Sequence, residues 1–252
     1  MQTFRLISRL DIKGPNLIKG VQLEGLRVIG DPAKYAKKYY DCGIDELIYI
    51  DVVASLYGRN TLLDVVKNTS SQVFVPLTVG GGIRMVDDVE GLLRAGADKV
   101  CLNTAAIKDK FFISEIANRF GSQCCVVEVQ GKRTSNGKWT ALFDNGRENS
   151  GLDAISWASE AVDLGAGEVL VTSVDQEGTR NGMDIELIKL ISATVDVPVI
   201  SSGGVGTPKD IISAYYQGGV DAVAVGDILH NDRYSIQEIK RSLDLVGISV
   251  RL

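Results

Sequence analysis

The feature that most constrains the fold of this chain is an internal repeat. Three pairs of segments match in order at an offset of 122 or 123 residues. The pairs are GIDELIYID (43–51) with GAGEVLVTS (165–173), VPLTVGGGI (75–83) with VPVISSGGV (197–205), and AGADKV (95–100) with GGVDAV (218–223). A chain whose halves carry the same succession of segments is expected to fold into two equivalent structural halves. We place these halves at about residues 1–122 and 123–252.

Short apolar segments alternate with amphipathic segments along the chain. The apolar segments predict eight strands, at residues 6–13, 47–53, 73–80, 99–103, 124–130, 169–173, 197–201 and 222–225. Several are rich in Val and Ile throughout, which is typical of parallel strands covered on both faces. The amphipathic segments, such as VDDVEGLLRAG (86–96) and PKDIISAYYQG (208–218), predict helices. This alternation indicates an α/β fold.

The repeat decides between the two α/β architectures that fit this alternation. Four βα units in each half close into an eight-stranded (βα)8 barrel, a TIM barrel, whereas a doubly wound sheet gives no reason for so even a duplication. The length of 252 residues is usual for one such barrel. We therefore predict a single (βα)8 barrel domain with a twofold half-barrel repeat.

Composition excludes several classes of function. The formal net charge of −5 argues against a nucleic-acid-binding protein, which is usually basic. The four cysteines form no C-x-x-C pair and have no histidine nearby, so we expect reduced thiols, no metal ion and no cofactor. The N-terminus lacks a secretory apolar region, and no apolar run approaches the ~20 residues that span a bilayer. The sequence thus predicts a cytoplasmic protein without a membrane segment.

Two segments interrupt the βα alternation. Residues 14–31 follow the first predicted strand and residues 131–151 follow the fifth, so both lie where barrel enzymes place their active-site loops. The second segment contains the dipeptide Asn-Gly twice, which predicts a hairpin. The first is either a mobile lid or an ordered surface loop.

Two glycine-rich turns indicate phosphate binding. Gly80-Gly81-Gly82 follows the third predicted strand, and Ser202-Gly203-Gly204 follows the seventh. Each precedes a helix, where free backbone N–H groups and the helix dipole favour an anion, and glycine lets the backbone approach it closely. Tight turns without a ligand are the alternative.

The residues beside the two turns differ between the halves. Asn103 and Thr104 end the fourth predicted strand and can donate hydrogen bonds to a phosphate. The matching pair in the second half is Gly226 and Asp227, and a carboxylate repels a phosphate by about 4 kcal/mol at ~4 Å and an effective dielectric constant near 20. The second site is therefore doubtful unless Asp227 turns away or caps the following helix.

Carboxylates at strand ends are the candidate acid–base groups. Asp11 ends the first predicted strand and Asp51 the second, both at the catalytic rim of a barrel, although Asp51 could serve only to fix a loop. Lys19, in the segment after Asp11, could bind phosphate or substrate. His230 is the only histidine, and we expect it on a surface loop.

Several motifs, in this order and at this spacing, resemble one family over essentially the whole chain. The family is the cyclase subunit of imidazole glycerol phosphate synthase (HisF). The motifs are LDIK (10–13), KG (19–20), DELIYID (45–51), VGGGI (79–83), ADKVCLNTAA (97–106), FGSQ (120–123) and VTSVDQEGT (171–179). The resemblance implies a barrel that receives ammonia from a glutaminase subunit and uses it to split and cyclise a bisphosphorylated ribulose-carboxamide nucleotide.

The resemblance also implies roles for individual residues. It assigns acid–base chemistry to Asp11 and to the position of Gln130, and phosphate contacts to Gly82, Asn103 and Thr104. Further substrate-binding positions would be Lys19, Asp51, Thr172, Gly178, Gly203, Gly204 and Gly226. A ring of charges at the strand starts would admit ammonia, and it comprises Arg5, Glu46, Lys99 and Glu168. Asp98 would contact the glutaminase. The alternative is that charges at strand starts only stabilise the rim.

Three positions depart from the family pattern at the substrate end. Gln130 stands where the family has its second catalytic aspartate, and glutamine does not titrate near neutral pH. Glu128 lies on the same strand face, about 6–7 Å lower by strand rise, and is a candidate displaced carboxylate. Glu177 replaces an aspartate at the second phosphate site, and Asp227 replaces a small hydroxyl residue there.

Two functional hypotheses follow. The first is an active cyclase that forms a heterodimer with a HisH-like glutaminase and tolerates Gln130. The second is a divergent relative that keeps the glutaminase and the ammonia route but serves a sugar amidotransferase in surface-polysaccharide synthesis. The loss of one catalytic acid commonly costs 10²–10⁴-fold in rate and favours the second slightly. A plain isomerase barrel would leave the charged ring without a purpose.

Overall fold

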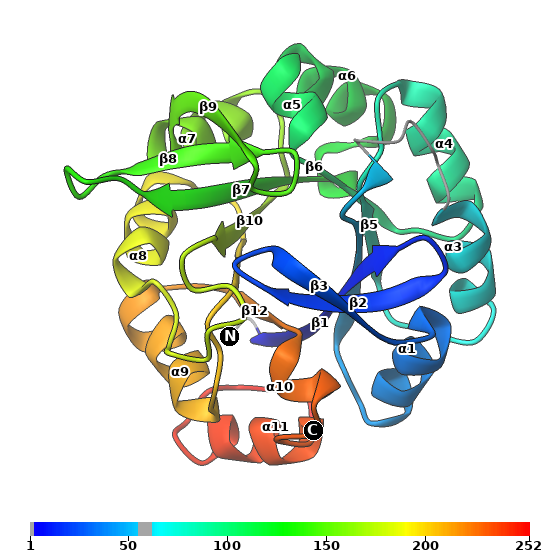
Figure 1. Cartoon of the computed structure of the whole chain (residues 1–252), viewed down its shortest axis with the longest axis vertical. Helices are drawn as coiled ribbons and strands as arrows, with labels where there is room; N and C mark the ends of the chain where they lie inside the picture. Colours follow the sequence, from blue (N-terminus) through cyan, green and yellow to red (C-terminus); the bar gives the residue numbers. More distant parts are fainter. Residues whose placement is uncertain (1–2, 55–61) are drawn as a thin grey trace.

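The computed structural model describes residues 3–54 and 62–252 and shows a closed barrel of parallel strands (Figure 1). Around the barrel the strands are β1 (Arg5–Lys13), β4 (Glu46–Asp51), β5 (Leu77–Gly80), β6 (Lys99–Leu102), β7 (Cys125–Arg133), β10 (Glu168–Ser173), β11 (Val199–Ser202) and β12 (Ala222–Val225). Closure comes from parallel pairing of β12 with β1 and of β7 with β10. The predicted (βα)8 barrel is confirmed.

Two predicted strands begin later than expected. Strand β5 starts at Leu77 rather than at residue 73, and β11 starts at Val199 rather than at residue 197. In both cases a proline, Pro76 or Pro198, comes directly before the first paired residue. Proline has no N–H group to donate to the ladder, so it marks the start of each strand.

Helices cover the outside of the barrel. They are α1 (Pro32–Asp41), α3 (Leu62–Ser70), α4 (Val86–Arg94), α5 (Thr104–Lys108), α6 (Phe111–Phe120), α7 (Ala154–Asp163), α8 (Ile185–Thr194), α9 (Pro208–Ser213), α10 (Asp227–His230) and α11 (Ile236–Asp244), with a 3-10 turn η1 (Ser122–Cys124) and a π turn η2 (Ala214–Gly218). Side-chain caps define several starts, as where Asp31 accepts hydrogen bonds from the backbone of Ala33 and Lys34. No helix in residues 3–54 and 62–252 is long and apolar enough to cross a membrane.

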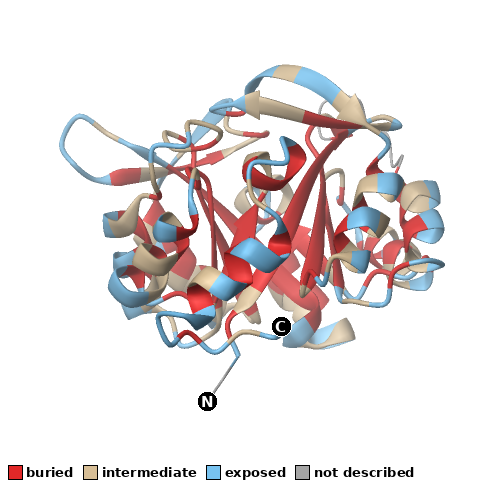
Figure 2. Ribbon diagram, turned by 90° about the horizontal axis from the view of Figure 1, so that it is seen from below, coloured by how far each residue is buried: buried red, intermediate tan, exposed pale blue. Residues whose placement is uncertain are grey.

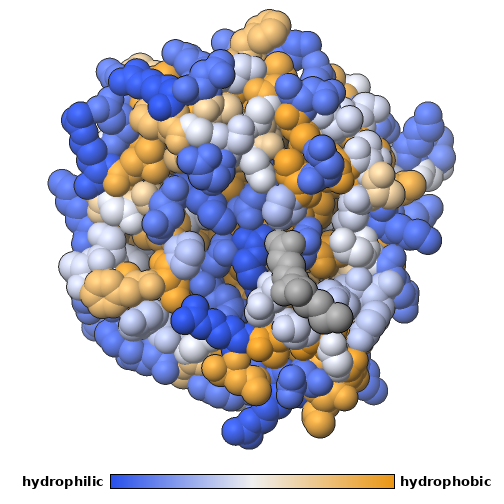
Figure 3. All heavy atoms as spheres, turned by 180° about the vertical axis from the view of Figure 1, so that it is seen from behind, coloured by the Kyte–Doolittle hydropathy of each residue, from blue (hydrophilic) through white to orange (hydrophobic). Residues whose placement is uncertain are grey.

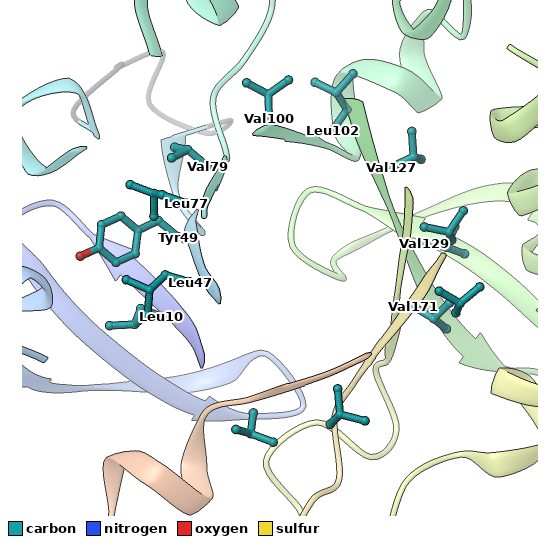
Figure 4. Close-up of a cluster of buried hydrophobic side chains, with 14 of the residues drawn as sticks. Leu10, Leu47, Tyr49, Leu77, Val79, Val100, Leu102, Val127, Val129 and Val171 are labelled. Carbon is teal, nitrogen blue, oxygen red and sulfur yellow. The ribbon is translucent and has the colours of Figure 1, made fainter. Parts of the chain in front are cut away.

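The core has two layers because successive strand side chains point to opposite faces. Leu10, Leu47, Val100 and Val127 point outward and pack beneath the helices (Figure 4). A smaller apolar cluster lies inside the barrel and includes Ile7 and other inward-facing residues. The strands are almost entirely buried, whereas the outer helix faces are exposed (Figure 2).

Both segments that interrupt the βα alternation are antiparallel hairpins above the upper face, the face at the carboxyl ends of the barrel strands (Figures 1 and 2). The first pairs β2 (Asn16–Val21) with β3 (Glu24–Gly30), and β2 continues the ladder of β1. It is therefore an ordered element rather than a lid without structure of its own. The second, β8 (Trp139–Phe143) with β9 (Glu148–Asp153), extends β7 and confirms the predicted hairpin.

Candidate functional site

A ring of four charged side chains closes the lower face of the barrel, where the strands begin. These four residues, hereafter the lower ring, are Arg5, Glu46, Lys99 and Glu168, and each is the first residue of its strand. Nη1 of Arg5 lies 2.8 Å from Glu46 and 2.7 Å from Glu168. Nζ of Lys99 lies 3.3 Å from Glu46 and 2.7 Å from Glu168. Each cation thus contacts both anions, and the ring is continuous.

Burial and charge act in opposite directions on the lower ring. Burial favours loss of the proton of Arg5, but the carboxylates of Glu168 and Glu46 outweigh it and raise the guanidinium pKa above its ordinary value. The Arg5 guanidinium therefore stays charged near neutral pH. On this side of the molecule, hydrophilic residues gather near the middle, with separate apolar patches toward the edge (Figure 3).

Asp98 lies on the same lower face and is exposed. Its carboxylate accepts a hydrogen bond of 2.8 Å from the backbone N–H of Leu77, at the start of β5. Asp221, its counterpart in the second half, makes the same bond to Val199 at 2.9 Å. Asp98 therefore has a structural role, which leaves its predicted contact with a partner open.

A buried cluster around Arg9 occupies the barrel interior above an apolar layer. The Arg9 side chain is 3% exposed. Its Nε lies 2.9 Å from Asp11, and its Nη1 lies 2.7 Å from Glu128 and 2.9 Å from Thr172. Sequence analysis missed Arg9, although a charged residue within the apolar strand 6–13, two positions before Asp11, was a usable signal.

The Arg9 cluster fixes the state of the candidate catalytic groups. Burial tends to raise the pKa of Asp11, but Arg9 and Lys19 lower it below its ordinary value, so this carboxyl is ionised and can accept a proton. The amide of Gln130 donates to Glu128 at 3.0 Å, and Glu128 also pairs with Arg9. Glu128 is thus engaged in the cluster rather than standing free as a displaced acid.

A cavity of about 280 Å³, hereafter the large cavity, lies at the upper face between the first glycine-rich turn and β7. It brings together five of the predicted residues, which are Asp51, Gly82, Asn103, Thr104 and Gln130. Arg84, Lys108 and Asn145 also line it and were not predicted. Among the described residues, both polar side-chain atoms of Asn145 and Oε1 of Gln130 are buried without a hydrogen-bond partner, so they remain able to bind a ligand.

Some predicted phosphate donors are already engaged. The amide of Asn103 donates to the backbone oxygens of Glu128 and Leu142, and the Thr104 hydroxyl accepts from the backbone of Asp144. These bonds hold the β8–β9 hairpin over the cavity. The carboxylate of Asp51 likewise accepts from two backbone N–H groups of the next segment, which agrees with the alternative role of fixing a loop.

The second glycine-rich turn borders a much smaller cavity of about 20 Å³, hereafter the small cavity. The predicted residues that line it are Lys19, Gly178, Gly203, Gly204 and Gly226. Ion pairs within the protein largely fill this region. Lys19 pairs with Glu177, and Arg180 binds both carboxylate oxygens of Asp227 at 2.7 and 3.1 Å.

Asp227 follows neither alternative given by the sequence. It lines the small cavity, and Gly226 rather than Asp227 is the N-cap of α10. Its charge is balanced by Arg180 and by Arg233 at 3.5 Å. Arg180 lies 47 residues from Asp227 in the chain, so no local pattern indicated this pairing. The two halves of the barrel thus differ: one offers an open cavity and the other an internally neutralised one.

The expected surface position of His230 is wrong. His230 is the last residue of α10 and is 5% exposed. Its ring stacks on Tyr39, with Nδ1 2.7 Å from the Tyr39 hydroxyl and Nε2 3.1 Å from the backbone oxygen of Arg9. Burial first, then the nearby charge of Lys19, lowers the pKa of His230 to about 4.

His230 is expected to make the protein less stable in mild acid. The unfolded chain takes up a proton near pH 6.5 and the folded chain only near pH 4, so the free energy of unfolding falls as the pH decreases through this window. The loss amounts to about 3 kcal/mol at pH 4. Urea unfolding of the unchanged protein and of His230→Gln between pH 7 and 4 should show this slope only in the former. Equal slopes would contradict the assignment.

The fold and the two faces define a class of protein. It is a duplicated (βα)8 barrel with a charged ring at its lower face and two glycine-rich turns at its upper rim. The sequence matches the family described as Histidine biosynthesis protein over residues 5–235. It is 62% identical over 206 residues to imidazole glycerol phosphate synthase subunit HisF of Legionella pneumophila, which covers 82% of this chain and 97% of that protein. It is 46% identical over 248 residues to the subunit HisF of Bacillus cereus strain Q1, which covers 98% of both. The chain belongs to the HisF family.

Proposed function

We propose that this chain is the cyclase subunit of an imidazole glycerol phosphate synthase and acts in the cytoplasm. Its glutaminase partner would dock on the lower face and release ammonia at the lower ring. The ammonia would pass through the barrel to a bisphosphorylated ribulose-carboxamide nucleotide at the upper face. The products would be imidazole glycerol phosphate and an aminoimidazole carboxamide ribotide.

The closed lower ring is the observation that carries this proposal. In a barrel whose chemistry needs only the upper face, two cations and two anions at the lower face add little stability. Apolar residues form a rim that is equally stable. Such a ring does separate the barrel interior from water while remaining able to open by exchange of ion-pair partners. Ionised Asp11, at the opposite end, supplies a base. It lines a third cavity, which shares Val52 and Asn145 with the lining of the large cavity.

A second candidate is a conduit that delivers ammonia to a sugar amidotransferase without cyclising a nucleotide. Two features of the substrate end are the ground for considering it, although the similar proteins are named as HisF subunits. Gln130 cannot donate a proton as an acid, and the small cavity of about 20 Å³ has little room for the second phosphate of a bisphosphorylated substrate. A phosphate there would also have to displace the Arg180–Asp227 or Lys19–Glu177 pair.

Turnover with ammonium salt separates the two candidates. Purified protein is mixed with the bisphosphorylated nucleotide and ammonium, and loss of substrate is followed. The cyclase proposal expects steady turnover, to which Gln130→Asp adds at most a small gain. An inactive parent whose activity appears in Gln130→Asp, with a rise of about 10²–10⁴-fold, would contradict the cyclase proposal, support the second candidate and locate the defect at residue 130.

The repeat provides a matched control for the partner contact of Asp98. Asp98→Ala and Asp221→Ala each remove one charged hydrogen bond to a strand start, so both should lower the free energy of unfolding by about 1.5–3 kcal/mol. Only Asp98→Ala is expected to weaken glutaminase binding, by about tenfold or more. Calorimetric titration with the glutaminase measures this, and equal affinities for the two variants would refute the contact.

A further inference from the structure

We propose that Arg9 and Glu128 form an inner gate across the barrel interior, which ammonia crosses between the lower ring and the large cavity. The inference rests on the ammonia route of the proposed function. It concerns two residues that the lower ring does not include.

The position of the pair in the barrel is the first argument. Arg9 lies on β1 and Glu128 on β7, and three strands separate these two on either side of the closed barrel (Figure 1). The 2.7 Å ion pair between them therefore spans the full width of the interior. Thr172 of β10 accepts from the same Nη1 and extends the closure toward a third strand. The bridge therefore crosses the path of a molecule that moves along the barrel axis.

The layering below the pair is the second argument. Each of the four strands that carry the lower ring has an apolar, inward-facing residue two positions after its ring residue. These four residues are Ile7, Ile48, Cys101 and Leu170. Arg9 lies two residues higher again, about 13 Å along β1 from Arg5 by strand rise. The apolar layer disfavours ammonium, since an unpaired ion is costly to bury, but it admits neutral ammonia. The molecule that reaches the Arg9–Glu128 bridge is therefore neutral ammonia rather than ammonium.

The bonding of Arg9 is the third argument. Its Nε and Nη1 are paired, but its Nη2 is buried without a partner among residues 3–54 and 62–252. A bridge that served only stability would be expected to satisfy all its donors. Arg9 also lines the small cavity, whereas Glu128 lines the large one. An anionic group of the acceptor that displaced the Lys19–Glu177 or Arg180–Asp227 pair at the small cavity would supply the missing partner. It would draw the guanidinium away from Glu128 and so open the passage when an acceptor is present.

The test compares two nitrogen sources in the intact complex with the glutaminase. Glutamine-derived ammonia must cross the interior, whereas external ammonium reaches the large cavity from the upper face. Product formation with each nitrogen source is measured for the unchanged protein, for Glu128→Gln and for the double variant Arg9→Met/Glu128→Gln. The double variant removes both charges together and so leaves no unpaired carboxylate at residue 128. Asn145→Ala changes the large cavity away from the interior and is the matched control.

The gate predicts that the ratio of glutamine-supported to ammonium-supported rate changes by about fivefold or more in both gate variants. Product formed per glutamate released should also fall below that of the unchanged protein when the acceptor is scarce. Asn145→Ala should lower both rates in proportion. If the gate variants also change the glutamine-supported and ammonium-supported rates by the same factor, Arg9 and Glu128 act only on the acceptor. The gate is then refuted. If the unchanged protein forms no product with either source, the proposed function fails and the gate with it.

Discussion

Arg9→Ala is expected to lower the free energy of unfolding by about 3–5 kcal/mol, because it leaves buried carboxylates without their cation. Asp11 and Glu128 both pair with this guanidinium, and both are buried, at 7% and 2% exposure. Breaking one side of a buried pair costs far more than removing both. Urea unfolding followed by the fluorescence of buried Trp139 and Trp157 measures the effect.

Two controls make this expectation specific. Arg180→Ala removes a more exposed arginine that also binds a carboxylate through two bonds, and should cost at most about 1 kcal/mol. Arg9→Ala/Glu128→Ala removes both partners and should recover part of the loss from the single change. A cost below about 1 kcal/mol for Arg9→Ala alone would show that water reaches the cluster.

Gly81→Ala is expected to cost about 3–5 kcal/mol and to disrupt the large cavity, through backbone strain and overpacking combined. Gly81 has φ +93°, and a Cβ atom there would lie 2.2 Å from the backbone oxygen of Asp51. That neighbour is main chain within the barrel wall and cannot rotate away. Gly43→Ala is the matched control, because its φ is +82° but no heavy atom lies within 4 Å of the added carbon.

The two glycine variants share the strain of a positive φ, so the difference between them isolates the close approach. Gly43→Ala should cost only about 1 kcal/mol. Chemical denaturation gives both values, and calorimetric titration with inorganic phosphate reports on the cavity. Equal stability losses would mean that the turn after β5 relaxes, and that Gly81 is there for its φ alone.

The open large cavity and the neutralised small cavity bear directly on the choice of acceptor. A bisphosphorylated substrate needs two anion sites, and here the second is occupied by Glu177 and Asp227 with their own cations. If the second phosphate of the proposed substrate binds at the small cavity, these pairs must rearrange on binding, whereas an acceptor with one phosphate requires no such change. The activity of Gln130→Asp alone does not distinguish an acceptor with one phosphate from an acceptor with two. Phosphate titration of Asp227→Ser is therefore a useful companion measurement.

Local sequence patterns were enough to predict the barrel. The prediction used strand and helix periodicity, the repeat, and the charges at the first residue of β1, β4, β6 and β10. These features depend on residues near one another in the chain or on a register that the repeat reveals. The hairpin after β7 followed from its Asn-Gly turns in the same way. The set of lower-ring residues came from the resemblance to the HisF family, and the strand assignment placed these residues at the strand starts.

The tertiary structure alone decided how the interior charges are paired. Arg9 meets Glu128 across the full barrel, Arg180 meets Asp227 across two loops, and His230 is buried because Tyr39 of α1 stacks on it. Such partners lie tens to hundreds of residues apart, so no local pattern records them. The sequence by itself determined which side chains face inward, because strand alternation is a property of the backbone. Only the closed barrel, which brings opposite strands together, determined which of these side chains meet and which cavity stays open. The physical reason is that a desolvated charge must have a partner within hydrogen-bonding distance.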